Sequence, residues 1–286
     1  MIRSILVPID GSPASDAALS ISCSISCLID ARVIGLFVQD ADRFKHVPLA
    51  SALAASIGAQ PAIEAPLPPA KLLEAEENVE AESLDLFQEF QSHCDQARTR
   101  SRFLCRRGNP AEEISEMGRS VDLIVIGNCG RHIGVEHKES GLTTNAVLHN
   151  TTRPVLVVPE EPAGLSRLVV AYDGSSASER VLRAAAELAS VMRLEEVHIV
   201  TVGEDVEKAR GTQRSAVLYL SNYEFLTVPA LFRGDPKQVI PDYAEEVDAS
   251  ILALGAFGSG KIAERIFGST TLVALQQPNV GILLSS

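Results

Sequence analysis

An internal repeat constrains this chain more than any other feature of its sequence. Residues 5–12 read ILVPIDGS, and residues 168–175 read LVVAYDGS. Three later pairs recur in the same order: GNP at 108–110 with GDP at 234–236, DLIVIGNCG at 122–130 with SILALGAFG at 250–258, and RPVLVVP at 153–159 with VGILL at 280–284. Because the order is the same in both halves, we interpret the chain as a tandem duplication of one domain.

The length of the chain and the connector between the copies agree with this interpretation. A chain of 286 residues has room for two domains of the usual size, roughly 100–200 residues each. The segment PEEPAGLS at 159–166 is rich in Pro, Gly and polar residues, which is typical of a linker. We therefore expect a first domain over 1–160 and a second domain over 166–286.

The first copy is longer than the second. From Asp10 to Gly108 there are 98 residues, but from Asp173 to Gly234 there are only 61, so the first copy carries 37 extra residues between about 40 and 100. The composition of this insertion predicts a Pro/Ala-rich extended linker followed by an acidic helix, at residues 60–70 and 71–97.

Both copies alternate short apolar runs with amphipathic helical stretches. Runs such as SILVPI at 4–9 and RVIGLFV at 32–38 lack polar alternation, as expected for strands that are buried on both faces. Ser176 and Glu179 have the spacing of a capping box at the start of a helix. Strict β–α alternation indicates an α/β fold with two tandem doubly wound parallel five-stranded sheets.

Composition and charge exclude several classes of protein. The chain has 25 Lys and Arg against 37 Asp and Glu, a net charge of −12, which argues against a broad nucleic-acid surface. No apolar run reaches the ~18–20 residues of a membrane span, and the amino terminus lacks the apolar stretch of a signal peptide. The five cysteines form no CxxC pair, so we expect reduced thiols in a cytoplasmic protein, with Cys23 and Cys27 packed in the core.

Two motifs of each copy fall where open parallel sheets bind ligands, beyond the carboxyl ends of the strands. The first motif is the Asp-Gly-Ser after the first strand. The second is a Gly-rich loop after the fourth strand, which in the second copy holds Gly255, Gly258, Gly268, Ser269 and Thr270. Glycine lets the backbone approach a phosphate closely, and amides and hydroxyls at a helix start can donate to its oxygens. These residues are therefore candidates for an anion site that needs no net positive charge.

The same loop contains a partial P-loop pattern. Residues 255–261 spell GxxxxGK, but the next residue is Ile262 rather than Ser or Thr. The hydroxyl that would hold Mg²⁺ is missing, and the pattern follows a fourth strand instead of opening a domain. We therefore do not interpret it as a P-loop.

Together these motifs resemble the universal stress protein family. The shared features are two (I/L)xVxxDGS starts, a GxP before the third helix and a G-x2-G-x9-G-(S/T) loop before the last helix, and as a tandem form they span nearly the whole chain. The resemblance implies a flavodoxin-like strand order 3-2-1-4-5, of the adenine nucleotide alpha-hydrolase-like type, and a bound adenine nucleotide. It also implies that Asp173, Ala171 and Val202 lie at the adenine, while the loop residues named above contact the ribose and phosphates.

The first copy keeps the adenine side of this pattern and departs from it on the phosphate side. Ten residues rather than nine separate Gly130 from Gly141, and Leu142 stands where the family has Ser or Thr. We therefore expect nucleotide to bind chiefly in the C-terminal domain, with a weaker site in the N-terminal domain. The residues of that weaker site are Pro8, Asp10, Val38, Gly127, Gly130, Gly141 and Thr143.

Several of these candidates have a simpler structural interpretation. Asp10 and Asp173 are of the kind that bonds turn amides after a strand. Ser12 and Ser175 are more typical of helix caps than of ligand contacts. Gly255 could serve only a tight turn. These alternatives stay open at the level of the sequence.

We predict a stress-response or signalling protein that binds ATP, ADP or AMP. Mg²⁺ can accompany ATP through the phosphate oxygens, and we expect no metal site and no catalytic residues in the protein itself. No nucleophile–base pair is visible near the loop, so we expect at most weak ATPase activity. Two alternatives stay open: a nucleotide-independent interaction module, with the insertion as a docking arm, and a slow ATP hydrolase.

The resemblance also carries expectations about partners. It implies that the two domains pair within the chain through their last strands. The outer surfaces would remain available for a homodimer and for a regulatory protein whose identity the sequence does not indicate. We expect neither nucleic acid nor a membrane as a partner.

Overall fold

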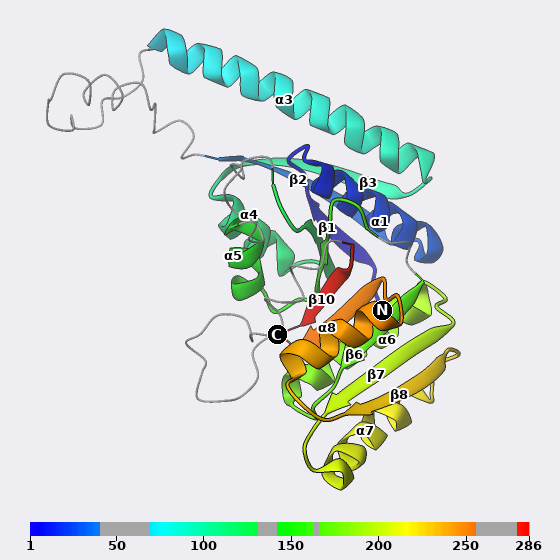
Figure 1. Cartoon of the computed structure of the whole chain (residues 1–286). Coiled ribbons are helices and arrows are strands. Elements are labelled where there is room, and N and C mark those ends of the chain that lie inside the picture. The colour runs from blue at the N-terminus through cyan, green and yellow to red at the C-terminus, as the bar shows by residue number, and fades with distance from the viewer. Residues whose placement is uncertain (41–68, 131–141, 163–165, 256–278, 286) are drawn as a thin grey trace, which may run out of the picture.

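A single mixed sheet forms the centre of the molecule (Figure 1). The computed structural model describes residues 1–40, 69–130, 142–162, 166–255 and 279–285. Within these residues ten strands lie in the order β3-β2-β1-β4-β5-β10-β9-β6-β7-β8. Their bounds are β1 Ser4–Pro8, β2 Arg32–Asp40, β3 Arg100–Gly108, β4 Leu123–Gly127, β5 Val155–Val158, β6 Arg167–Ala171, β7 Glu196–Val202, β8 Leu226–Phe232, β9 Ile251–Gly255 and β10 Gly281–Ser285.

Each half of this sheet has the strand order 3-2-1-4-5. In the first half β1 lies between β2 and β4 and is parallel to both. In the second half β6 lies between β7 and β9 in the same way. The doubly wound parallel arrangement with five strands in each half is therefore confirmed.

The two halves join through their last strands. β5 and β10 pair antiparallel, with Leu283 opposite Leu156 and Ile282 opposite Val157. Both strands are buried along their whole length. The pairing removes two sheet edges that would otherwise expose unpaired backbone groups. The intramolecular pairing that the resemblance implied is confirmed.

Helices cover both faces of the sheet, so the molecule has three layers. One face carries α1 (Pro13–Ile29), α3 (Pro69–Gln96), α6 (Ser176–Val191) and α7 (Val206–Leu220), and the other carries α4 (Pro110–Gly118), α5 (Leu142–Asn150) and α8 (Pro236–Glu246). Successive strand residues enter opposite cores: Ile5 and Val7 contact the first group of helices, and Leu6 contacts the second. The strands are apolar without alternation because both of their faces are buried. None of the helices in the described part of the chain is long and apolar enough to cross a membrane.

Serine side chains begin the helix that follows the first strand of each half. The N-cap of α1 is Ser12 and the N-cap of α6 is Ser175, and each hydroxyl accepts a hydrogen bond from the amide three residues further on. The capping interpretation of both serines is confirmed. The capping box expected for Ser176 and Glu179 is wrong, because Gly174, with φ +77°, turns the chain so that Ser175 takes the extended cap conformation.

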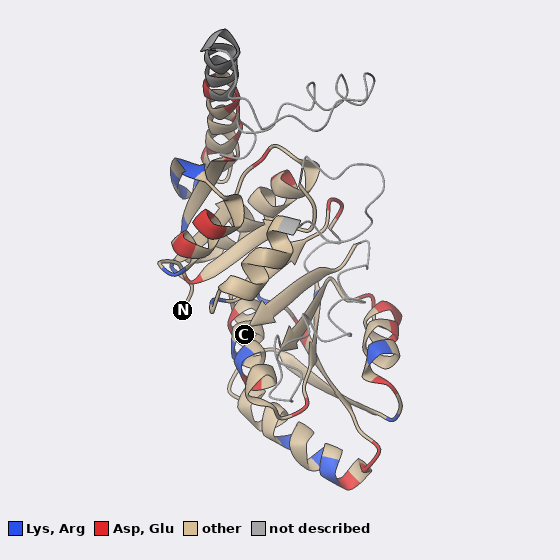
Figure 2. Cartoon of the chain, turned by 90° about the vertical axis from the view of Figure 1, so that its left-hand side faces the viewer, with Lys and Arg blue, Asp and Glu red and all other residues tan. Residues whose placement is uncertain are grey.

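The insertion of the first copy contributes the long helix α3. This helix begins at Pro69, inside the stretch expected to be an extended linker, because proline is tolerated in the first turn of a helix. Leu86, Phe90 and Cys94 recur every four residues and are buried, which seats α3 on β2, β3 and α1. Gly35 on β2 leaves room for this contact, since a Cβ there would lie 2.7 Å from Cε2 of Phe90. From this seat α3 extends past the edge of the sheet (Figure 1), and acidic residues lie along its described part (Figure 2).

A polar anchor fixes the first strand of each half at its amino end. The Asp122 carboxylate accepts hydrogen bonds from the Arg3 amide at 2.8 Å and from the Ser4 amide and hydroxyl at 3.1 and 3.0 Å. Burial opposes ionisation, but these hydrogen bonds hold the pKa of Asp122 below its usual value. In the second half the Ser250 hydroxyl takes the same place, accepting from the Arg167 amide and donating to the Arg167 carbonyl. A carboxylate and a hydroxyl thus perform one structural task in the two copies.

Candidate functional site

Each half of the sheet has one switch point, which we call its crevice position, at the carboxyl ends of its own strands. Because β5 and β10 pair antiparallel, the two positions lie at opposite edges of the sheet. From β1 the chain passes through α1 to β2, which lies on one side of β1 in the sheet. Later it passes through α4 to β4, which lies on the other side of β1. The order of the strands therefore switches between β1 and β4. The same switch separates β6 from β9. Asp10 and Asp173 follow the first strands, while Gly127 and Gly255 end the fourth strands. The structure therefore brings the Asp and Gly candidates of each copy to neighbouring strand ends, as expected.

Asp10 stabilises the turn between β1 and α1. Its Oδ1 accepts from the Ser12 amide at 3.0 Å and from the Ser12 hydroxyl at 2.6 Å. The Ser12 hydroxyl also lies 3.4 Å from the Cys129 carbonyl oxygen, and a Cβ built on Gly130 would lie 2.8 Å from Oδ2 of Asp10. The loop that follows β4 therefore begins directly against the Asp10 carboxylate, which is half-buried.

Asp173 stabilises the equivalent turn of the second half, but its side chain is exposed. Its Oδ1 accepts from the Ser175 amide at 2.9 Å. Desolvation opposes ionisation, but hydrogen bonds from Ser175 and Ser178 hold the pKa of Asp173 below its usual value. The turn-bonding interpretation is confirmed for Asp10 and for Asp173. It leaves capacity for a ligand, because a carboxylate has about four acceptor positions.

The glycines that end the fourth strands allow the first helix of each half to pack closely. A Cβ on Gly127 would lie 2.8 Å from the Cβ of Ala14 and 2.9 Å from its carbonyl carbon. A Cβ on Gly255 would lie 2.7 Å from the carbonyl carbon of Ala177 and 2.8 Å from the amide nitrogen of Ser178. Both glycines thus have a sufficient packing reason, independent of any phosphate. The close approach also brings the start of α6 next to the point where the chain leaves β9.

The apolar candidates lie at or near the carboxyl ends of the first and second strands of each half. Pro8 ends β1, Val38 lies near the end of β2, Ala171 ends β6 and Val202 ends β7. All four are half-buried. Val38, Ala171 and Val202 pack against the core beneath α4, α5 and α8. They supply an apolar border on one side of each crevice position.

The first half shows what its remaining candidates contact. Thr143 is half-buried in the first turn of α5. Its neighbour Thr144 is buried and donates its hydroxyl to the Gly127 carbonyl at 2.9 Å, so that hydroxyl ties α5 to the end of β4. Burial, with the negative charges of Glu160 and Asp10, raises the pKa of the Cys129 thiol. That thiol is consequently protonated and a poor nucleophile at neutral pH.

Much of the expected phosphate loop lies outside the described residues. This holds for Gly258, Gly268, Ser269 and Thr270 in the second copy and for Gly141 in the first. Within the described part of the chain, His, Cys, Asp and Glu side chains form no group of three that could hold a metal ion.

Comparison with known sequences decides the family. The sequence model of the universal stress protein family matches residues 1–159 and 224–284, which is more than half of the chain. The chain belongs to the universal stress protein family. The match leaves out residues 160–223, and this interval contains β6, α6, β7 and α7 together with Asp173.

Solved structures match this universal stress protein over both halves. A universal stress protein from Archaeoglobus fulgidus DSM 4304 has a TM-score of 0.73 at 20% identity, covering 99% of this chain and 96% of that one. A functionally unknown protein from Pseudomonas aeruginosa PAO1 has a TM-score of 0.63 at 16% identity, covering 99% and 92%. These likenesses show the same fold across the interval that the family match leaves out.

A sequence relative covers a smaller part. Universal stress protein Slr1230 of Synechocystis sp. is 25% identical over 172 residues, which is 59% of this chain and 60% of that protein. The match thus spans less than two thirds of the relative's own length.

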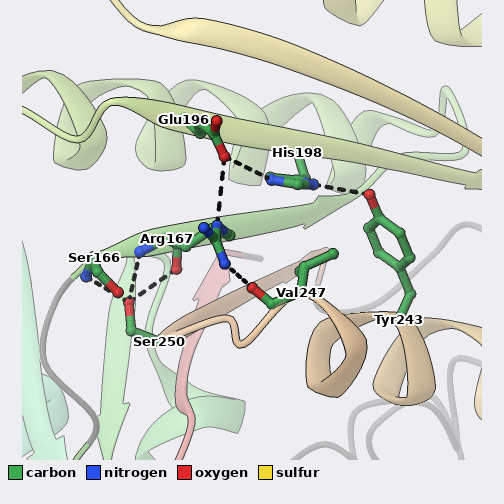
Figure 3. A network of polar contacts seen from close by, with 7 residues as sticks. All are labelled: Ser166, Arg167, Glu196, His198, Tyr243, Val247 and Ser250. Atoms are coloured by element: carbon green, nitrogen blue, oxygen red, sulfur yellow. Dashed lines mark hydrogen bonds and ion pairs between the residues drawn. The ribbon is translucent and has the colours of Figure 1, made fainter.

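A polar network around the buried His198, in the second half of this universal stress protein, was not foreseen from its sequence (Figure 3). Nδ1 of His198 lies 2.8 Å from the Tyr243 hydroxyl, and Nε2 lies 3.5 Å from Oε2 of Glu196. Oε2 of Glu196 also lies 3.5 Å from Nε of Arg167, whose guanidinium bonds the Val247 carbonyl. The network ties β6, β7 and α8 together at the amino ends of the strands of the second half, opposite the crevice position of that half. The apolar run VHIV around His198 was the one available signal for a buried histidine.

Replacing His198 with glutamine is expected to reduce the loss of stability on acidification. Burial lowers the pKa of His198 below 6.5, and Arg167 lowers it further, while Glu196 opposes the shift. The unfolded chain then binds the proton first, so wild-type stability falls as the pH drops from 6.5 through the lower folded pKa. Each unit of that depression corresponds to about 1.4 kcal/mol.

Urea unfolding of both proteins between pH 8 and pH 5 measures this effect. The difference in unfolding free energy between His198→Gln and wild type should shift in favour of the variant as the pH falls. Parallel pH profiles for the two proteins would contradict the assignment of a depressed pKa to His198.

Proposed function

We propose that this protein binds an adenine nucleotide, chiefly at the carboxyl edge of its second half. The observation that carries the proposal is the exposed Asp173, which is ionised at neutral pH and follows the first strand of that half at the switch point. Its carboxylate can accept hydrogen bonds from the exocyclic amine of an adenine. Ala171 and Val202 supply the apolar border against which the base would lie.

The phosphates would be held by amides and hydroxyls rather than by net charge. The candidates are Gly255 and, outside the described residues, Gly258, Gly268, Ser269 and Thr270. Backbone amides at a helix start suit anionic oxygens even in a chain with a net charge of −12. A Mg²⁺ ion would be carried by the nucleotide's phosphate oxygens. We propose regulation by the bound nucleotide with at most weak hydrolysis, in the cytoplasm, where nucleotides and reduced thiols occur together.

The first half is proposed as the weaker site. Its Asp10 is half-buried against Gly130 and the Ser12 hydroxyl, whereas Asp173 is exposed. The loop on its phosphate side also has one residue more than that of the second half, and Leu142 stands where the second half has Ser269. We also propose that the chain forms two domains, over 1–160 and 166–286, because each half of the sheet has its own strand order and one crevice position.

Substitution of Asp173 by asparagine is expected to weaken ATP binding by about tenfold. Asparagine can still accept from the Ser175 amide and keep the turn, so the loss isolates the negative charge, at about 1.4 kcal/mol for a charge-assisted hydrogen bond. Titration calorimetry with MgATP measures the dissociation constant.

Asp10→Asn is the matched control, and it should change the affinity of the stronger site by less than about twofold, since it lies in the other half of the sheet. Gly268→Val should abolish binding through the loop. Absence of ATP binding by the wild-type chain would overturn the proposal. A larger effect of Asp10→Asn than of Asp173→Asn would overturn the preference for the second half.

A second candidate function rests on α3. This helix extends past the sheet edge, and its Leu84 and Phe87 side chains are 55% and 39% exposed. We propose, as the alternative to nucleotide control, a nucleotide-independent interaction module in which α3 contacts a protein partner. Partner capture that is unaffected by ATP and lost on deletion of 41–97 would favour this alternative.

A further inference from the structure

Two cysteine thiols from distant parts of the chain meet in the core of the first half. Sγ of Cys23 on α1 lies 3.9 Å from Sγ of Cys94 on α3, and the two residues are 71 positions apart. They are 4% and 0% exposed, respectively. The other three cysteines lie nearer to solvent: Cys27 and Cys105 are exposed and Cys129 is half-buried, so the core position expected for Cys27 is wrong. The pair therefore lies at the contact between the inserted helix and the common fold.

We propose that Cys23 and Cys94 form a reversible disulfide that fastens α3 to α1. The sulfur atoms must approach each other by roughly 2 Å to reach the usual bond length of about 2.05 Å. Both cysteines lie on helices that are already in contact, so the approach crosses an existing interface and needs no rearrangement of the fold. The proposal concerns the first half and does not depend on nucleotide binding.

The surroundings of the pair divide the two thiols into a nucleophile and a proton donor. The hydrogen bond from the Cys23 thiol lowers the pKa of Cys94 to about 7, against the opposing effect of burial, with Thr99 and Ser101 helping to lower it. The interaction with Cys94, together with burial, raises the pKa of Cys23. Cys94 consequently carries the thiolate, which is the reactive form.

Hydrogen peroxide is the oxidant class that balances the reaction. The Cys94 thiolate attacks one peroxide oxygen, the O–O bond breaks, and the departing hydroxide takes up a proton to become water. This step oxidises the Cys94 sulfur by two electrons to a sulfenic acid. The Cys23 sulfur then attacks the Cys94 sulfur, the S–S bond forms, and the S–O bond breaks. The hydroxide released in that second step leaves as water with the Cys23 proton.

Access to the pair runs through the last turn of α3. The helix ends at Gln96, two residues after Cys94, and the Thr99 amide holds the Cys94 carbonyl at 3.0 Å. Terminal turns open locally at lower free energy than the core, so a small oxidant can reach Cys94 during such openings. Oxidation should therefore be slower than at the exposed Cys27 and Cys105, and the product should hold the turn closed.

The test uses the full-length protein, reduced and then exposed to hydrogen peroxide. Non-reducing digestion and mass spectrometry should yield a linked peptide pair that contains Cys23 and Cys94, two hydrogen atoms lighter than the sum of its parts. Dithiothreitol should reverse the link. Amide hydrogen exchange at residues 86–96 should slow on the order of tenfold or more in the oxidised protein, because a closed disulfide opposes opening of that turn.

Two variants make the result decisive. The triple variant Cys27→Ala, Cys105→Ala and Cys129→Ala leaves the buried pair untouched, so it should form the same intramolecular link. Cys94→Ser should leave Cys23 as a free thiol after the same treatment. The proposal is overturned if the triple variant retains two free thiols after Cys27 and Cys105 of the wild type are fully oxidised. It is also overturned if the links that form join separate chains.

Discussion

Replacement of Gly255 by alanine is expected to destabilise the protein by about 2–3 kcal/mol and to weaken nucleotide binding at the second half. The added Cβ would lie 2.7 Å from the carbonyl carbon of Ala177 and 2.8 Å from the amide nitrogen of Ser178. Both are backbone atoms in the first turn of α6, so no side chain can rotate away to make room. Either the end of β9 or the start of α6 must move. The turn that carries Asp173 is attached to that start, so its carboxylate should be displaced as well.

Gly211→Ala is the matched control, because Gly211 lies in α7 and a Cβ there would meet nothing within 4 Å. Alanine favours the helix over glycine, so this variant should be neutral or more stable by up to about 1 kcal/mol. Gly127→Ala, which would meet Ala14 in the first half, should destabilise the protein to a similar extent and leave MgATP binding at the second half unchanged. Urea unfolding and MgATP titration measure the two effects. Equal stability of Gly255→Ala and Gly211→Ala would contradict the close-packing argument.

Replacement of Phe90 by alanine is expected to cost about 3–4 kcal/mol and to loosen α3 from the sheet. Phe90 is 1% exposed, and its ring occupies the space above Gly35 on β2. The ring also lies 5.4 Å from that of Phe103 on β3, centroid to centroid. Loss of the side chain removes a large buried apolar surface and leaves a cavity at the seat of the helix. Hydrogen exchange along residues 80–96 and urea unfolding measure the result.

Leu84→Ala on the same helix is the control for this prediction. Leu84 is 55% exposed, so its truncation should change stability by no more than about 0.5 kcal/mol. Amide protection of α3 should survive in Leu84→Ala and fall in Phe90→Ala. If both variants keep the protection of wild type, α3 is held by contacts other than those of Phe90.

The elements of the fold could be predicted because their signals are local. The apolar runs at 4–9 and 32–38 correspond to β1 and β2, and the repeat order placed equivalent strands in the second half. The start of α3 at Pro69 was missed. The prolines of 60–70 were interpreted as helix breakers, but proline is tolerated in the first turn of a helix. The cap of α6 at Ser175 was predicted correctly, whereas the capping box at Ser176 and Glu179 was wrong, because the conformation of Gly174 decides the geometry of that turn.

The candidate site could be predicted only in its outline. Asp173 and Gly255 were recognised by motif, and the strand order puts them at neighbouring strand ends. The close approach of Gly255 to Ala177 was not foreseeable, because 78 positions separate the two residues and only helix packing brings them together. The contact between His198 and Tyr243 was not foreseeable for the same reason.

The sequence by itself determined that the chain is two copies of one β–α unit, unequal by an insertion, with an Asp-Gly-Ser after the first strand of each. These properties reside in local composition and order, which need no distances. Only the tertiary structure decided which contacts the motifs make. It assigned Gly127 and Gly255 to helix packing, left Asp173 exposed while Asp10 lies against Gly130, and placed Cys23 beside Cys94. These contacts depend on how the helices pack onto a twisted sheet, and the order of residues along the chain does not specify that packing.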